Sequence, residues 1–149
     1  MSRSSEQIEA ARQDSLGRLL LNAHRAHRSV FLEKIRQLGA DDHINASLTN
    51  IMIHIPSEGI RLADIAKASD MTRQSVSQFV SELETMGYVK RIPDPSDGRA
   101  TLVRFSRKGW DIMQRALQVK HEFESEVAKQ LTPDGYTQFI NALKIVGSL

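Results

Sequence analysis

The sequence predicts a mainly α-helical protein with six helices and one β-hairpin, in which four helices precede the hairpin and two follow it. Three observations support this fold class. Apolar residues recur at helical spacing along most of the 149-residue chain, which is typical of helices with one buried face. Residues 61–86 divide into two short helical segments around a brief turn. The stretch DPSDGRATLVRF at 94–105 combines turn residues with a β-branched run.

Length and composition limit the possible functions. A chain of 149 residues suits one domain with a core, or one domain with helical extensions. It contains no cysteine, which excludes disulfides and thiolate metal ligands. Neither a bilayer-spanning run nor a secretory stretch is visible, so we expect a soluble, cytoplasmic protein without a membrane partner. Positive charge is concentrated in residues 61–108, which hold nine basic and six acidic side chains.

The first two helices are bounded by capping and breaking residues. Ser4 or Ser5 is suited to cap a long first helix, and Gly39 is suited to end it. Asn45 is suited to cap a second helix that runs through Ile55. The first helix is long for so small a domain, so we expect its far end to have a partner.

Residues 61–86 form the predicted helix-turn-helix. A first short helix covers 61–69, and Thr72 caps a second helix that ends near Met86 before Gly87. The opposite faces of this second helix differ in chemistry: one carries amides and hydroxyls, without the Glu–Lys pairs that are usual on a solvated helix. The other carries the apolar side chains that we expect to pack inward, namely Val76, Phe79, Val80 and Leu83.

The hairpin is predicted from two short runs of strand-forming residues, YVKRI at 88–92 and TLVRF at 101–105. Between them, Pro95 presets φ for a tight turn and Gly98 supplies a positive φ, while the neighbouring aspartates can bond backbone amides. Arg99 is expected at the tip of the hairpin.

Two helices follow the hairpin. Ser106 is suited to cap a long helix over 107–131, and Thr132 with Pro133 opens a last helix through Val146. Together with the first helix, these helices carry more apolar side chains than one small domain would cover. The surplus indicates a surface that is buried against a partner.

The polar face of the second short helix suits contact with double-stranded DNA. Glutamine amides can bond adenine at two atoms, and serine hydroxyls can bond bases or phosphates. A polar surface helix without a ligand is the alternative, but the preceding short helix and the basic hairpin favour DNA. The candidate contacts are Thr72, Arg73, Gln74, Ser75, Ser77, Gln78 and Ser81 on the helix and Arg91 on the hairpin.

Three motifs resemble the MarR family of bacterial winged-helix regulators: GYVKR at 87–91, DPSDGR at 94–99 and FSRKG at 105–109. The six-helix order extends the resemblance over nearly the whole chain. It implies a winged helix-turn-helix in which the hairpin is a DNA-probing wing. It also implies that Arg99 enters a minor groove and that Asp97 braces the wing.

The chain departs from the family pattern at two places. Arg61 stands where the family often has a capping threonine or serine, so we expect that helix to lack a side-chain cap and Asp64 to compensate through the helix dipole. Phe105 and Ser106 stand where the family usually has Leu-Thr, a change that keeps a hydroxyl cap.

The resemblance further implies a homodimer joined through its N- and C-terminal helices. The expected division is a dimerisation helix at 1–43, a winged lobe at 44–109 and dimerisation helices at 110–149, all within one domain. Two recognition helices would then enter successive major grooves of a pseudo-palindromic duplex. The expected dimer contacts are Val127, Leu131, Phe139, Leu143 and Val146.

A small-molecule effector is the expected regulator by the same resemblance. Its expected pocket, between the dimer helices and the winged lobe, is lined by His24, His27, Arg28, Met52 and His54. We expect no cofactor and no metal, because the histidines form no compact ligand pattern. The chain also lacks the common catalytic motifs, so we do not expect an enzyme. Two alternatives stay open: a zinc-responsive regulator, and a winged helix that binds a protein instead of DNA.

Overall fold

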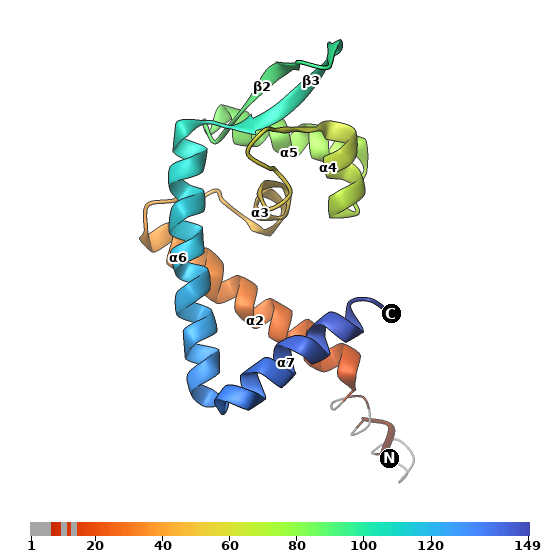
Figure 1. Ribbon diagram of the computed structural model, residues 1–149, viewed down its shortest axis with the longest axis vertical. Coiled ribbons are helices and arrows are strands. Elements are labelled where there is room, and N and C mark those ends of the chain that lie inside the picture. Colours follow the sequence, from red (N-terminus) through yellow and green to blue (C-terminus); the bar gives the residue numbers. More distant parts are fainter. Residues whose placement is uncertain (1–6, 10–11, 13–14) are drawn as a thin grey trace.

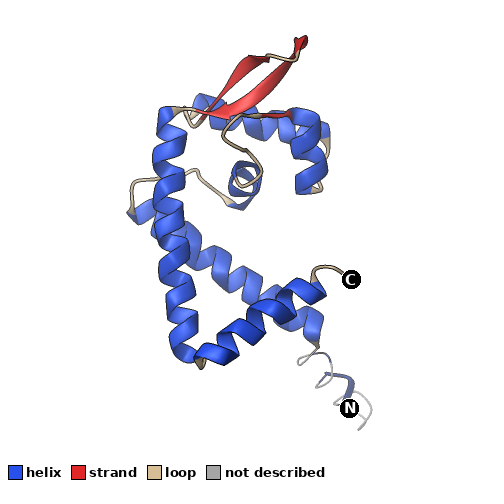
Figure 2. Ribbon diagram, in the orientation of Figure 1, coloured by secondary structure: helices blue, strands red, loops and turns tan. Residues whose placement is uncertain are grey.

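The computed structural model describes residues 7–9, 12 and 15–149. A compact lobe with a projecting hairpin sits at one end of a pair of long helices, and the C-terminus lies toward the other end (Figure 1). The elements, in chain order, are α2 (Leu16–Gln37), α3 (Ala46–Met52), β1 (Ile60–Arg61), α4 (Leu62–Ser69), α5 (Arg73–Thr85), β2 (Val89–Asp94), β3 (Asp97–Phe105), α6 (Arg107–Gln130) and α7 (Pro133–Val146). The mainly α-helical fold class with one hairpin is confirmed (Figure 2).

Most of the predicted caps are present. Asn45 accepts hydrogen bonds from the Ser47 and Leu48 amides at the start of α3. Thr72 accepts from the Ser75 amide at the start of α5. Thr132 accepts from the Gly135 amide at the start of α7, where Pro133 occupies the first turn. Because each cap satisfies an amide that the helix itself leaves unpaired, these short polar residues set where the helices begin.

The sheet contains one strand that the sequence analysis did not predict. β3 lies between β1 and β2, and both neighbours pair with it antiparallel. Only two residues of β1 take part, with Ile60 opposite Val103 and Arg61 opposite Leu102. So short a strand has no detectable alternation, which is why its sequence reads as a turn followed by a helix.

Three other expectations were wrong. The first helix does not run unbroken from Ser4 or Ser5, which lie outside the described residues, because Ser15 has an extended backbone and α2 begins after it. The second helix ends at Met52, where turns take over before residue 55. Gly98 has no positive φ and belongs to β3, since the tight turn consists of the two residues before Asp97.

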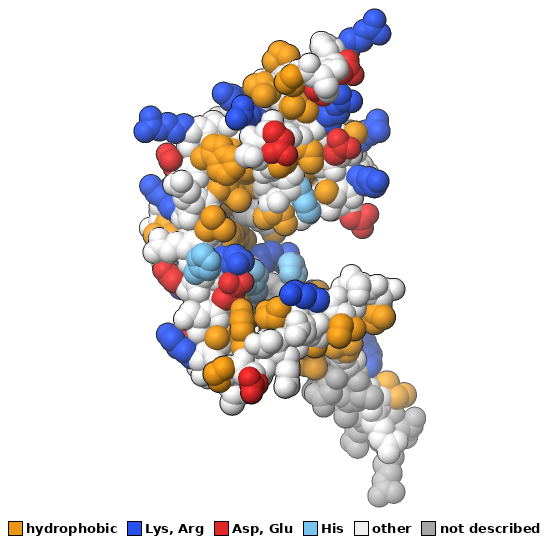
Figure 3. Space-filling model, in the orientation of Figure 1, with side chains coloured by type: hydrophobic (Ala, Val, Ile, Leu, Met, Phe, Trp, Pro, Cys, Tyr) orange, Lys and Arg blue, Asp and Glu red, His pale blue; other side chains and the backbone are white. Residues whose placement is uncertain are grey.

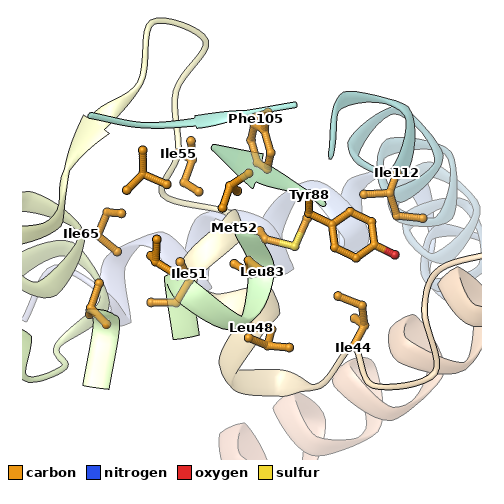
Figure 4. Close-up of a cluster of buried hydrophobic side chains, with 14 of the residues drawn as sticks. Ile44, Leu48, Ile51, Met52, Ile55, Ile65, Leu83, Tyr88, Phe105 and Ile112 are labelled. Atoms are coloured by element: carbon orange, nitrogen blue, oxygen red, sulfur yellow. The ribbon is translucent and has the colours of Figure 1, made fainter. Parts of the chain in front are cut away.

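Most of the hydrophobic core lies inside the lobe, between α3, α4, α5 and the sheet, and it continues to Ile35 of α2 and Ile112 and Val119 of α6 (Figure 4). α3 contributes Leu48, and α5 contributes Val76, Val80 and Leu83, all of which are fully buried. Phe79 packs partly buried against the same cluster. The predicted inward face of α5 is therefore confirmed, and its opposite face is left for solvent or a ligand.

The hairpin joins α6 through a close-packed junction. The Ser106 hydroxyl accepts from the Gly109 amide at 3.0 Å and donates to the Gly87 carbonyl at 2.6 Å. The Ser106 amide donates to the Tyr88 carbonyl at 2.9 Å. A Cβ on Gly109 would overlap that same carbonyl. Glycine is therefore required where the first turn of α6 meets the chain that leaves α5.

The long helices carry an unusual share of exposed apolar surface. α6 packs against α2 and α7 (Figure 1), yet α7 has no buried residue and α2 has only Ile35. Phe139 is 43% exposed and Ile145 is 63% exposed. Within the described part of the chain, no helix is both long and apolar enough to cross a lipid bilayer. These three helices, α2, α6 and α7, form the arm of the molecule. The arm therefore exposes apolar side chains that the chain itself does not cover.

The junction at Gly109 generates a stability prediction. Gly109→Ala should lower the free energy of unfolding by about 3 kcal/mol, because the new methyl group meets backbone that cannot rotate away. Urea denaturation, followed through the fluorescence of the single tryptophan, measures this loss. Gly17→Ala is the matched control: a Cβ there meets nothing within 4 Å, so it should stabilise α2 by up to about 1 kcal/mol. Equal effects of the two substitutions would contradict the prediction.

Candidate nucleic-acid interface

The outer face of α5 presents two glutamine side chains to solvent. Gln74 and Gln78 are exposed and stand one turn apart. Neither side chain hydrogen-bonds to any residue within 15–149, and the same holds for exposed Arg73 in the first turn. A glutamine amide with both its donor and its acceptor free can bond the edge of a base.

The hydroxyls of Ser75 and Ser81 on α5, unlike the glutamine side-chain amides, take part in hydrogen bonds within the part of the chain that the structure describes. The Ser75 hydroxyl shares a hydrogen bond with Thr72 at 2.9 Å, beside the helix cap. The Ser81 hydroxyl donates to the Ser77 carbonyl at 2.9 Å, one turn earlier. Ser77 itself is only partly exposed. Of the helix residues predicted to contact DNA, those nearest the N-terminus of α5 are therefore the most available.

Arg99 lies beside the hairpin tip, within a bulge of β3. Asp94 pairs with Asp97 while the preceding residue, Pro93, pairs with Thr101. Residues 98–100 of β3 consequently have no paired residue on β2, and Arg99 is the middle one of the three. Bulges turn side chains away from the regular strand directions. The exposed Arg99 side chain has no partner among residues 15–149, while its amide donates to Asp97 at 3.1 Å.

The tip of the hairpin is fastened by a buried carboxylate. Asp94 is 6% exposed. One of its oxygens accepts from the Ser96 hydroxyl at 2.7 Å and the Ser96 amide at 2.8 Å. The other accepts from Arg61 Nε at 2.7 Å, and Asp97 lies 3.7 Å from the same guanidinium. The bracing that the resemblance assigns to Asp97 falls in this structure mainly to Asp94.

These contacts change the acid–base behaviour of the pair. Hydrogen bonds from the Ser96 side chain and amide, followed by that from Arg61, lower the pKa of Asp94 to about 2. The hydrogen bond to Asp94 in turn raises the pKa of Arg61. Both shifts favour the charged forms, so the pair remains ionised at neutral pH.

The base of the hairpin is fastened to α5 by a second ion pair. The Arg91 guanidinium pairs with the Glu84 carboxylate and donates to the Ser81 hydroxyl at 3.1 Å. The Arg91 amide donates to the other Glu84 oxygen at 3.2 Å. Arg91 thus lies along the C-terminal half of α5 instead of projecting freely.

Lys and Arg side chains are visible on the surface of the lobe (Figure 3), and their hydrogen bonds divide them into two groups. Those that the protein engages are Arg61, Arg91, Arg104 and Lys108, which hold carboxylates or backbone carbonyls. Those that are exposed and unpaired within the described chain are Lys67, Arg73, Lys90, Arg99 and Arg107. The second group is free to bind phosphate.

A cavity of about 740 Å³ lies where α2, α3 and α6 meet below the lobe. Four of the five predicted pocket residues line it: His24, His27, Arg28 and Met52. His54 does not, because it follows the end of α3 and lies outside the cavity wall. Histidine side chains are visible around the hollow between the lobe and the arm in Figure 3.

The cavity wall combines apolar surface with charge. The ring of His27 lies 4.7 Å from that of Phe123, edge to face. α6 contributes Lys120 and Glu124, which the sequence analysis did not select. Across residues 7–9, 12 and 15–149, no three histidine or acidic side chains are grouped closely enough to hold a metal ion.

Two side chains that shape the interface were missed by sequence reasoning. Arg61 was noticed only as an absent helix cap, and α4 indeed lacks a side-chain cap. Its partner Asp94 is 33 residues away. The sequence analysis assigned no contact to Glu84. No periodicity links either residue to its partner, because both ion pairs form between separate elements.

Comparison with known proteins finds sequence similarity centred on the lobe. Residues 48–100 match the family model described as MarR family. The HTH-type transcriptional regulator BilQ of Clostridioides difficile (strain CD3) is 22% identical over 85 residues, which span 57% of this chain and 57% of that protein. The alignment thus covers little more than half of that curated relative.

Solved structures extend the similarity to the arm. Wild-type MarR from E. coli in its apo form is 25% identical, with a TM-score of 0.71 over 89% of this chain and 96% of that one. A mutant E. coli MarR complexed with operator DNA has the same fold, with a TM-score of 0.71 at 23% identity over 91% of this chain and 96% of that one.

The buried carboxylate generates a pH prediction. A lowered pKa means that Asp94 adds stability above its usual pKa near 3.8 and loses it as the pH falls through about 2. The gap in unfolding free energy between the unsubstituted protein and Asp94→Asn should therefore be constant above about pH 5 and narrow between pH 4 and 2. Chemical denaturation across this range measures it. Asp111→Asn, at an exposed site on α6, is the control, and a gap that stays constant down to pH 2 would refute the prediction.

Proposed function

Because residues 48–100 match the MarR family model and the fold matches that of E. coli MarR, we propose that the protein is a homodimeric, sequence-specific transcriptional regulator of this family that binds double-stranded DNA. Its role is that of a repressor, which a small-molecule effector releases from a pseudo-palindromic site. The helix-turn-helix is formed by α4 and α5, and the wing is the hairpin of β2 and β3.

One observation carries the proposal: a helix face with free amides stands beside a wing with a free arginine. Gln74 and Gln78 supply base-reading groups on α5, and Arg99 supplies the probe on the wing. Amides in a major groove discriminate base pairs, whereas an arginine in a minor groove responds to groove width and potential. A winged helix that binds a protein would instead present apolar anchors on this face.

The homodimer follows from the uncovered arm. An α7 with no buried residue gains little from burial within one chain, because much of its apolar surface faces water. Phe139, Leu143 and Leu131 are each more than a third exposed, while Val127 and Val146 are partly covered. To bind two successive major grooves, a dimer joined at this arm has to hold its two α5 helices about 34 Å apart.

The effector site is the cavity between arm and lobe. Its walls join apolar side chains to His24, Arg28 and Lys120, a mixture that suits a small, largely apolar molecule with a polar group. The wall belongs partly to the arm and partly to the lobe. Suppose that one arrangement of arm and lobe binds DNA and another does not. A ligand that binds the second arrangement more tightly than the first lowers the DNA affinity, at most by the ratio of its two affinities.

The proposal predicts selective DNA binding that depends on Gln78. A fluorescent duplex from the region upstream of the protein's own gene serves as the probe. The unlabelled form of this duplex should displace the probe better than a shuffled duplex of equal length. Gln78→Ala should reduce this preference by about 1–3 kcal/mol at one base pair if the amide bonds its base at two atoms. Anisotropy competition with single-base variants of the duplex locates the affected position.

Gln138→Ala, on α7, is the matched control because Gln138 is equally exposed and lies far along the chain from the wing. It should leave every affinity unchanged. Equal losses for Gln78→Ala on all duplexes would remove this residue from base reading. The absence of any preferred duplex would instead favour the protein-binding alternative.

The dimer has its own prediction. Leu143→Asp should shift the protein to monomers at micromolar concentration, because it places a charge in the apolar face of α7. Gln138→Asp adds the same charge to the polar face of the same helix and should leave the dimer intact. Sedimentation velocity distinguishes the two states. Unchanged dimers with Leu143→Asp would place the interface elsewhere.

A further inference from the structure

We propose that Arg91 and Glu84 form a clamp that positions the wing, and that Arg91 does not bind phosphate. Glu84, a carboxylate on the recognition helix, is then required for DNA binding instead of opposing it. The inference rests on the proposed DNA-binding function and assigns roles within it. It also replaces the expectation that Arg91 contacts DNA.

The geometry of Arg91 supports a positioning role. Three of its groups are held at once: its amide and one guanidinium nitrogen by Glu84, and a second guanidinium nitrogen by Ser81. The planar guanidinium makes such a fork well, because its donors point in fixed directions. Glu84 and Ser81 lie one turn apart on α5, so the fork fixes both where β2 lies along the helix and how it is rotated.

The charges lead to the same conclusion. Glu84 neutralises Arg91 at close contact, and the Arg91 side chain is only 29% exposed. Glu84 and Ser81 already engage two of the guanidinium donors, and the negative charge of Glu84 opposes the approach of a phosphate to those that remain. Lys90, the preceding residue on β2, is exposed and has no such partner within residues 15–149. The phosphate contact near the wing base therefore belongs to Lys90.

The clamp also reduces the number of α5 side chains that can bond a base or a phosphate. The Ser81 hydroxyl donates to the Ser77 carbonyl and accepts from Arg91, so its one proton is already used. Ser81 has no donor left for a base or a phosphate. Direct readout is thereby confined to the N-terminal half of α5, where Arg73, Gln74 and Gln78 are free.

Salt dependence separates a phosphate contact from a positioning contact. Each neutralised phosphate adds about −0.9 to the slope of log affinity against log salt. Lys90→Gln should therefore make the slope shallower by about 0.9 per subunit. Arg91→Gln should weaken binding roughly fivefold while leaving the slope unchanged, because the wing is displaced but no phosphate contact is lost. The titration uses the full-length dimer and the preferred duplex.

Glu84→Gln gives the sharpest outcome, because the two roles predict opposite signs. Removing a negative charge from a DNA-binding face should tighten binding if the carboxylate only repels phosphate. As part of the clamp, its loss should weaken binding about as much as Arg91→Gln does. Arg91→Lys should resemble Arg91→Gln as well, since lysine keeps the charge but cannot form the fork.

Circular dichroism shows whether each variant is folded at the temperature of the titration. Should Arg91→Gln unfold, Ser81→Ala removes only one arm of the fork and should still weaken binding at an unchanged slope. A shallower slope for Arg91→Gln, matching Lys90→Gln, would overturn the inference, as would tighter or unchanged binding for Glu84→Gln. If the unsubstituted protein binds no duplex, the proposed function fails first, and the inference fails with it.

Discussion

The ion pair between Arg61 and Asp94 is the constraint on which the geometry of the wing depends. β1 pairs with β3 only at residues 102 and 103, so the outer half of the hairpin is a two-stranded ribbon. Such a ribbon is marginally stable in water. Arg61 reaches from the start of α4 to the turn, and Ser96 completes the hydrogen bonds of the carboxylate. The wing tip is thereby tied to the helix-turn-helix, and the buried charge has its partners.

The inner end of the wing is tied by separate contacts. Glu84 and Ser81 hold Arg91 on β2, and Ser106 and Gly109 join β3 and α6 to the chain that follows α5. The wing is thus connected to α4, α5 and α6 at different points along its length. A DNA-binding surface made of two parts benefits from this rigidity, because a fixed offset lowers the ordering cost of binding.

The arm meets the lobe along the core and the cavity. Ile35 of α2 and Ile112 of α6 belong to the same buried cluster as the residues of the lobe, while the apolar face of α7 is uncovered. The cavity lies at this junction, because its lining comes from both parts. Under the proposed function, a ligand bound there would contact arm and lobe together.

Much of the fold could be predicted from the sequence because the information is local. Asn45, Thr72, Ser106 and Thr132 begin their helices as expected, since each cap bonds an amide two or three residues away. The inward face of α5 also follows from spacing within a single helix. β1 and the break at Ser15 could not be predicted, because two paired residues and one extended serine leave no periodic signal.

For the site, the sequence alone determined which residue types α5 and the wing present, and the motif at 94–99 indicated the wing. Only the tertiary structure decided which of those side chains are free. Arg91 and Arg99 are both wing arginines, yet one is held by Glu84 and the other is unpaired in the described chain. The difference arises because an arginine is paired only when folding brings a carboxylate within about 4 Å of it. The position of that carboxylate in the sequence follows no fixed spacing.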